Sequence, residues 1–267
     1  MTPVPKVQSR ESAPPPIDAA LAGFEARFDI RFARYALYSK SFLEELHHAP
    51  AATDAKPRIQ VATERHPALL HHFAVFSEVA NAEEPSAELR CRYFDGLRAI
   101  YGTLDQTPAR FLADSGVAFV APEREGRILA QKMGWQPDGR SFHPNAKRIR
   151  YEGGLLVGLT EFQVERHFDR VEIIDGAIAS GATLMAVMDC MAASSRIFDI
   201  YSVHATTEGL RALSGFARIR KLDLTVFVGH VTAGLNDHYY ATDSDSSRLV
   251  VGDLGDTISD LPQASRP

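Results

Sequence analysis

The sequence of 267 residues is poor in cysteine, in long apolar runs and in excess basic charge. Its two cysteines, Cys91 and Cys190, are too few for a disulfide framework and lack metal-ligand spacing, which favours a reducing cytoplasm. The 29 Lys and Arg are outnumbered by 34 Asp and Glu and are scattered, so we expect no basic face for nucleic acid. The most apolar stretch, residues 173–192, is interrupted by Asp175 and Asp189, which argues against a membrane-spanning helix.

Apolar residues make up 45% of the chain and charged residues 24%, the balance of a soluble globular protein. Residues 1–16 are rich in proline and have no apolar signal-peptide core, so we expect a disordered tail there. Aromatic residues and leucines then recur at spacings of three and four, which predicts one helix over residues 17–48 whose stripe packs against the core or a subunit interface. The expected organisation is this helical extension with a linker over residues 17–57 and one domain over residues 58–262.

Beyond the linker the pattern changes to helices and short apolar strands. Ser86 is suited to cap a helix that carries Leu89, Tyr93 and Leu97 on one side. Further along we expect strands over residues 116–121, 170–175, 197–205 and 224–230, helices over 126–134 and 183–192 and from 208, and a hairpin over 147–159. Strands that are apolar on both faces and alternate with helices indicate a mainly parallel sheet covered on both sides, an α/β fold.

The turn within VEIIDGAIASGATLMAVMD, residues 171–189, carries the most chemical information. An apolar strand ends at Asp175, and small residues lead to a buried helix that starts near Thr183. A helix start with small residues and the hydroxyls of Ser180 and Thr183 suits a phosphate, and Asp175 could accept hydrogen bonds from sugar hydroxyls. The glycines do not form GxGxxG and no Gly-Lys-Ser/Thr follows, which disfavours a dinucleotide fold and excludes a P-loop. A purely structural turn is the alternative.

An acidic strand end followed by a small Ser/Thr-Gly-x-Ser/Thr loop resembles the phosphoribosyltransferases, and IIDGAIASGAT is similar to the uracil phosphoribosyltransferase version. Five further segments resemble motifs of that family in the same order, so that the likeness covers roughly residues 60–260. They are ERHPALLHHF (64–73), VAPEREG (120–126), VHATTEGLRAL (203–213), AGLN (233–236) and VVGDLGD (250–256). The resemblance implies the type I phosphoribosyltransferase fold, with the hairpin as its hood.

The resemblance also implies an activity and a set of site residues. The activity is phosphoribosyl transfer from 5-phosphoribosyl-1-pyrophosphate (PRPP), with Mg2+, to uracil or a related acceptor, with release of pyrophosphate, by a cytoplasmic homodimer or higher homo-oligomer. The catalytic residues would be Asp175, Arg124 and Asp256, and Asp256 would also reach the metal. PRPP would be bound by Glu123, Arg124, Glu125, Gly126, Asp175, Gly176, Ala179, Ser180, Gly181, Ala182 and Thr183. The acceptor would be bound by Tyr239, Tyr240, Val251, Gly252 and Gly255. The alternatives are a surface charge for Arg124 and a turn role for Asp256.

The sequence departs from the family at several of these positions. Gly176 stands where the family has proline, and Glu123 and Glu125 place two carboxylates beside the expected pyrophosphate site. The 13 residues DHYYATDSDSSRL separate Asn236 from Val250, beside the acceptor segment, where the family has a much shorter link. The donor half of the site is therefore kept better than the acceptor half. Three interpretations stay open: uracil salvage, transfer to a non-uracil acceptor in a specialised pathway, and a non-catalytic PRPP-binding regulator.

Overall fold

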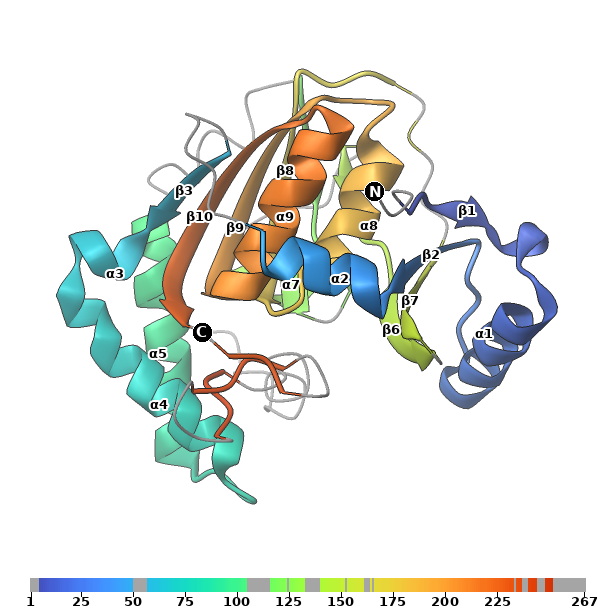
Figure 1. Ribbon diagram of the computed structural model, residues 1–267. Coiled ribbons are helices and arrows are strands. Elements are labelled where there is room, and N and C mark those ends of the chain that lie inside the picture. The colour runs from blue at the N-terminus through green and yellow to red at the C-terminus, as the bar shows by residue number, and fades with distance from the viewer. Residues whose placement is uncertain are drawn as a thin grey trace.

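In the part of the chain that it describes, the computed structural model contains two β-sheets and the helices that cover them (Figure 1). It describes residues 5–49, 57–104, 116–123, 125–132, 140–151, 153–160, 164, 166–232, 234–236, 240–243 and 248–251. Among these residues, no helix combines the length and the apolar character that a membrane crossing requires.

Within the described ranges the main sheet has six strands, and all of the strand pairs there are parallel. In spatial order the strands are β3 (Arg58–Val61), β10 (Asp223–Thr232), β9 (Ile197–Thr206), β8 (Arg170–Ile178), β4 (Val117–Val120) and β5 (Ser141–Phe142). The central strands β8, β9 and β10 bury mostly apolar side chains on both faces, as is typical of strands between two helical layers. The expected α/β fold with a parallel sheet is confirmed.

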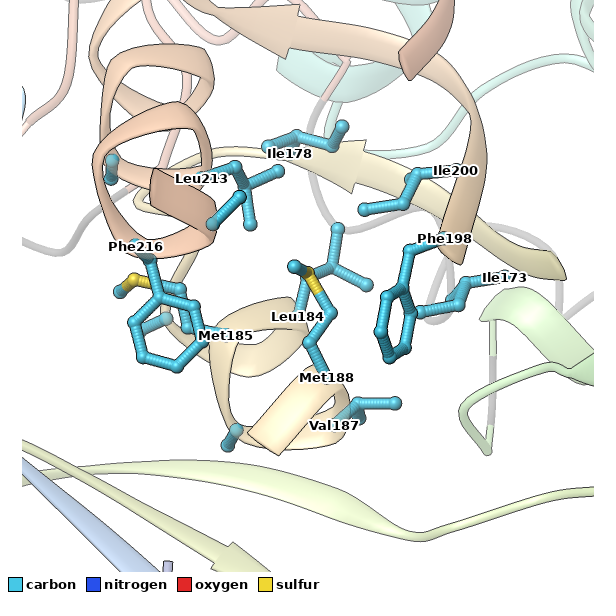
Figure 2. Packing of buried hydrophobic residues seen from close by; sticks show 14 of the residues in the cluster. Ile173, Ile178, Leu184, Met185, Val187, Met188, Phe198, Ile200, Leu213 and Phe216 are labelled. Atoms are coloured by element: carbon cyan, nitrogen blue, oxygen red, sulfur yellow. The ribbon is translucent and has the colours of Figure 1, made fainter. Parts of the chain in front are cut away.

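Helices cover both faces of this sheet and enclose two hydrophobic cores. One face carries α4 (Leu70–Asn81), α5 (Ala87–Leu104) and α7 (Glu125–Lys132), and the other carries α8 (Ala182–Met191) and α9 (Thr207–Arg220). Figure 2 shows the core on the face that carries α8 and α9. These helices bring leucine, methionine and phenylalanine side chains against the isoleucines of β8 and β9. As expected, Ser86 caps α5, because its Oγ accepts a hydrogen bond from the Leu89 N–H. Before α4 come α3 (Ala62–Arg65) and a 3₁₀ turn (Pro67–Leu69).

A smaller antiparallel sheet of four strands lies beside the main sheet. Its order is β1 (Gln8–Ser9), β2 (Arg34–Ser39), β7 (Gly154–Leu159) and β6 (Ala146–Tyr151). The β6–β7 pair is the hairpin expected over residues 147–159, and its turn uses Gly153 at φ +90°, a conformation that glycine adopts without strain. Because β2 pairs with β7, the N-terminal extension and this hairpin form one sheet.

The prediction of one continuous helix over residues 17–48 is wrong. The segment forms α1 (Pro15–Phe28), the strand β2 and α2 (Lys40–His47). Asp29 takes a left-handed conformation that ends α1, and the Ser39 hydroxyl caps α2 by accepting a hydrogen bond from the Phe42 N–H. Tyr35 and Tyr38 have a helical spacing in the sequence, but the backbone of β2 pairs with β7 and both rings are buried.

The N-terminal tail also differs from the expectation of disorder. Within it, β1 pairs with β2, and a 3₁₀ turn (Arg10–Ser12) follows. The Val7 N–H donates to Asp189 of α8, whose other carboxylate oxygen lies 2.9 Å from the Arg220 guanidinium of α9. Local composition did not reveal these contacts because their partners lie far along the chain, 182 residues away for Val7 and Asp189.

Candidate active site

The predicted phosphate loop is a tight connection between β8 and α8. After β8 ends at Ile178, the residues Ala179, Ser180 and Gly181 lead directly into α8. Gly181 adopts φ +76° at the helix N-cap, a left-handed conformation that suits glycine. The Ala182 N–H donates to the Ser180 hydroxyl at 3.3 Å, and Ser180 is only 1% exposed. The order of strand, turn and helix is as the sequence predicted, and α8 begins at Ala182, one residue before the expected start.

The first turn of α9 packs directly against this loop. The Thr206 hydroxyl donates to the carbonyl oxygen of Ala179 at 2.6 Å and accepts a hydrogen bond from the Gly209 N–H at 2.8 Å. A Cβ at Gly209 would clash with the Ala179 carbonyl oxygen, so only glycine allows this close approach. The neighbouring Glu208 accepts a long hydrogen bond, 3.5 Å, from the Gly234 N–H. The Glu-Gly pair after β9 thus links the loop to the segment that follows β10.

A histidine from the N-terminal extension contacts the loop from a second side. The Nε2 atom of His47, at the end of α2, lies 3.2 Å from the carbonyl oxygen of Ser180. His47 is 7% exposed, and burial lowers the pKa of its imidazole while the hydrogen bond to Ser180 acts in the opposite direction. Sequence reasoning missed this residue, since nothing in a His-His pair at a helix end points to a partner 133 residues away.

Asp175 lies within β8, three residues before its end, and not at the strand terminus as expected. The strand is longer because Ala177 and Ile178 still pair with His204 and Ala205 of β9. Asp175 is half-buried, and its Oδ1 accepts a hydrogen bond from the N–H of Gly176 at 2.9 Å.

The segment after β4 meets β8 beside Asp175. A Cβ at Gly126, in the first turn of α7, would clash with the carbonyl oxygen of Ile174, so glycine lets this segment lie against the strand. The carboxylate of Glu123 forms an ion pair of 2.7 Å with Arg127. One of the two carboxylates that the sequence placed beside the pyrophosphate site is therefore paired with a cation. Arg124 and the Glu125 side chain lie outside the described part of the chain.

The predicted acceptor residues lie in the segment after β10, of which residues 234–236, 240–243 and 248–251 are described. In Figure 1 this red segment lies between α4 and the β6–β7 hairpin. On the hairpin side, the Arg148 guanidinium carbon lies 5.4 Å from the centre of the Tyr240 ring. On the helix side, Leu249 accepts hydrogen bonds from Ser77 and Asn81 of α4.

Of the other predicted acceptor residues, Val251 is buried and the rest lie outside the described residues. The Val251 side chain is buried in the core beside α4 and α5, so at this position the backbone is the group that can face a ligand. Tyr239, Gly252, Gly255 and Asp256 fall outside the described residues. Within the described ranges, no three His, Cys, Asp or Glu side chains are grouped to hold a metal ion.

Two histidines that the sequence reasoning missed lie side by side near the same edge of the sheet. His204 of β9 and His230 of β10 occupy paired positions, with ring centres 6.3 Å apart, and Phe73 of α4 contacts both rings. His204 is fully buried, and burial lowers its pKa to about 3. His204 is therefore neutral at physiological pH.

No protein-family model matches the chain, and no curated protein does. Among solved structures, the AQ2163 protein from Aquifex aeolicus is similar over 75% of this chain and 97% of its own, with a TM-score of 0.51 and 19% identity. Adenine phosphoribosyltransferase from Trypanosoma brucei covers 73% of this chain and 95% of its own, with a TM-score of 0.42 and 13% identity. The enzyme from Leishmania donovani covers 79% and 99%, with a TM-score of 0.39 and 13% identity. The likeness to AQ2163 shows a shared fold.

Proposed function

We propose that this protein is a PRPP-dependent phosphoribosyltransferase, a pentosyltransferase that works at the edge of the sheet where β8 ends. The observation that carries the proposal is the loop from Ala179 to Thr183, in which a left-handed glycine starts a buried helix shortly after the strand that carries Asp175. Free N–H groups and the partial positive charge of a helix start bind phosphate, so this turn suits the 5′-phosphate of PRPP. Ser180 and Thr183 add hydroxyl groups.

The neighbouring residues suit the rest of the donor. Asp175 would accept hydrogen bonds from the ribose hydroxyls, with Gly176 keeping the backbone close. Arg124, with the backbone of Glu123 to Gly126, would bind pyrophosphate. In the reaction a nucleophile of the acceptor bonds to C1 of PRPP while the bond from C1 to the pyrophosphate oxygen breaks. The departing anion gains negative charge and the sugar becomes cation-like, so both need fixed charges of opposite sign and exclusion of water.

Mg2+ would accompany PRPP. A hard cation of this kind binds carboxylate oxygens together with substrate phosphates, and it would neutralise the charge of the leaving group. The carboxylates of Asp175 and Asp256 have the oxygen donors that such an ion prefers. The extra acid near this site, Glu123, is paired with Arg127, which lowers its repulsion of pyrophosphate.

The acceptor we propose is uracil or a related ring with a nucleophilic nitrogen, as in nucleotide salvage. Tyr239, Tyr240, Gly252, Gly255 and the Val251 backbone would bind it. The Arg148–Tyr240 contact favours a second candidate, a non-uracil acceptor, because it ties the inserted segment to the hairpin beside this half of the site. A domain that binds PRPP without turnover is the third candidate, and it would keep the loop but release no pyrophosphate.

We further propose a homodimer or higher homo-oligomer in the cytoplasm, with residues 58–262 as the transferase domain and residues 17–57 as its extension. Phe28, at the end of α1, leaves 46% of its surface exposed, which suits contact with a partner surface. Light scattering at micromolar concentration should give at least twice the monomer mass, and a monomeric mass would contradict the oligomer.

The test of the function is pyrophosphate release from PRPP and Mg2+, with and without uracil, with the products resolved by mass. Uracil-dependent release with formation of UMP supports the salvage enzyme. Release only with other heterocycles or amines supports the altered acceptor, and tight PRPP binding without release supports the regulator. Asp175→Asn should lower turnover at least about a hundredfold, while Asp95→Asn, which changes an exposed carboxylate on α5, should not. Absence of both PRPP binding and turnover would refute the proposal.

A further inference from the structure

We propose that His47 is a positioning residue that orients the phosphate loop from the N-terminal extension. The inference rests on the proposed function, because it assigns a role within the same PRPP site. It concerns the backbone of Ser180 and Gly181, which His47 contacts through the Ser180 carbonyl oxygen.

The position of His47 is fixed by the packing of α2 on α9. Leu46 lies over Gly215, where a Cβ would come within 2.6 Å of the Leu46 Cδ2 atom, so the missing side chain lets the two helices approach closely. Arg211 of α9 donates to the carbonyl oxygen of His47 at 3.4 Å. The backbone of His47 is therefore held by the helix that also carries Gly209 to the loop.

The direction of the hydrogen bond follows from its partners. A carbonyl oxygen only accepts, so Nε2 of His47 carries the hydrogen and donates it to Ser180. The preceding carbonyl, that of Ala179, accepts a hydrogen bond from Thr206. Two consecutive carbonyl groups of the loop are thus bonded by side chains of the surrounding elements.

This pairing sets the direction of the two N–H groups that follow. In a trans peptide unit the C=O and the next N–H point in opposite directions. With the carbonyl groups of Ala179 and Ser180 bonded to Thr206 and His47, the N–H groups of Ser180 and Gly181 point away from those two side chains. Among the described residues, none accepts a hydrogen bond from either N–H. These are the groups that we expect to bind the 5′-phosphate.

The loop needs such a restraint because of Gly181. Glycine rotates about its backbone bonds more freely than any other residue, so the peptide unit between Ser180 and Gly181 can turn over unless its carbonyl is held. Thr206 holds only the preceding peptide unit. The hydrogen bond from His47 therefore makes the N-terminal extension a working part of the donor site.

The test compares a variant that removes the donor with one that restores it. His47→Leu removes the N–H donor, His47→Gln supplies an amide donor of similar reach, and His48→Leu changes an exposed histidine next in the chain. PRPP affinity is measured by calorimetry with Mg2+, and steady-state kinetics give KM for PRPP and for the acceptor. We expect His47→Leu to weaken PRPP binding about fivefold or more and to raise KM for PRPP but not for the acceptor. His47→Gln and His48→Leu should stay within about twofold of the wild type.

The outcomes separate the two proposals. If the wild type does not bind PRPP, the proposed function fails and this inference fails with it. If the wild type binds PRPP and His47→Leu binds it equally well, the function stands and the role of His47 is refuted. Equal losses in the Leu and Gln variants would also refute it, because the ring would then act by packing alone. Should His47→Leu not fold in a thermal melt, His47→Met gives the same comparison with an unbranched side chain.

Discussion

Gly209 lies so close to Ala179 that the Ala179 carbonyl oxygen occupies the space that a Cβ at Gly209 would need. The start of α9 can therefore approach the loop between β8 and α8 only with glycine at this position. The Ala179 carbonyl oxygen also accepts a hydrogen bond from the Thr206 hydroxyl, so a side chain at Gly209 would disturb that hydrogen bond as well.

We predict that Gly209→Ala displaces the loop and lowers PRPP affinity at least about tenfold, while destabilising the fold by about 1–3 kcal/mol, as overpacking does. Calorimetric titration and chemical denaturation measure the two effects. Gly102→Ala is the matched control, because this helical glycine of α5 has open space around it. Alanine there should stabilise the protein by about 0.5–1 kcal/mol and leave PRPP binding unchanged. Wild-type affinity in Gly209→Ala would mean that the loop does not bind phosphate.

The ion pair between Glu123 and Arg127 leads to a second prediction. Arg127→Gln leaves the Glu123 carboxylate without its cation beside the proposed pyrophosphate site, so KM for PRPP should rise about threefold. The double variant with Glu123→Gln should return KM to the wild-type value. Because both side chains are partly exposed, the melting temperature should change little. A KM that stays high in the double variant would show that Arg127 acts by some route other than neutralising Glu123.

A third prediction concerns the contact between Arg148 and Tyr240, which joins the hairpin to the segment after β10. Tyr240→Leu removes the aromatic ring and should raise KM for the acceptor at least about threefold, with KM for PRPP within about twofold. Arg150→Gln is the control, because it changes an exposed arginine of β6, the strand that also carries Arg148. If KM for PRPP rises as much as KM for the acceptor, the segment after β10 does not belong to the acceptor half.

The buried His204 predicts how stability depends on pH. Burial lowers its pKa to about 3 in the folded protein, well below the value of about 6.5 in an unfolded chain, so between these values the unfolded state binds more protons. The contribution of His204 to the free energy of unfolding is complete above pH 6.5 and is lost as the pH falls. Between pH 7 and pH 5 this loss lowers the free energy of unfolding by about 2 kcal/mol. Urea denaturation at several pH values should show a shallower dependence in His204→Gln than in the wild type. The exposed His66→Gln should keep the wild-type slope, and equal slopes in all three proteins would contradict the prediction.

Much of the fold could be predicted from the sequence because it follows from local periodicity. Strands that are apolar on both faces, alternating with helices, indicated the parallel sheet, and the small residues from Ala179 to Thr183 indicated the tight turn before α8. Ser86 was correctly predicted as a cap because capping depends on residues three positions apart.

Other features were decided only by the tertiary structure, because their partners lie far apart in the chain. The spacing of Tyr35 and Tyr38 fits a helix, yet pairing with β7 makes this segment a strand. His47 meets Ser180 only after α2 has packed on α9, and His204 meets His230 only after β9 has paired with β10. The sequence by itself determined the α/β class and the position of the small-residue loop between β8 and α8, since both depend on neighbouring residues. Which side chains surround that loop depended on long-range packing, which no local pattern encodes.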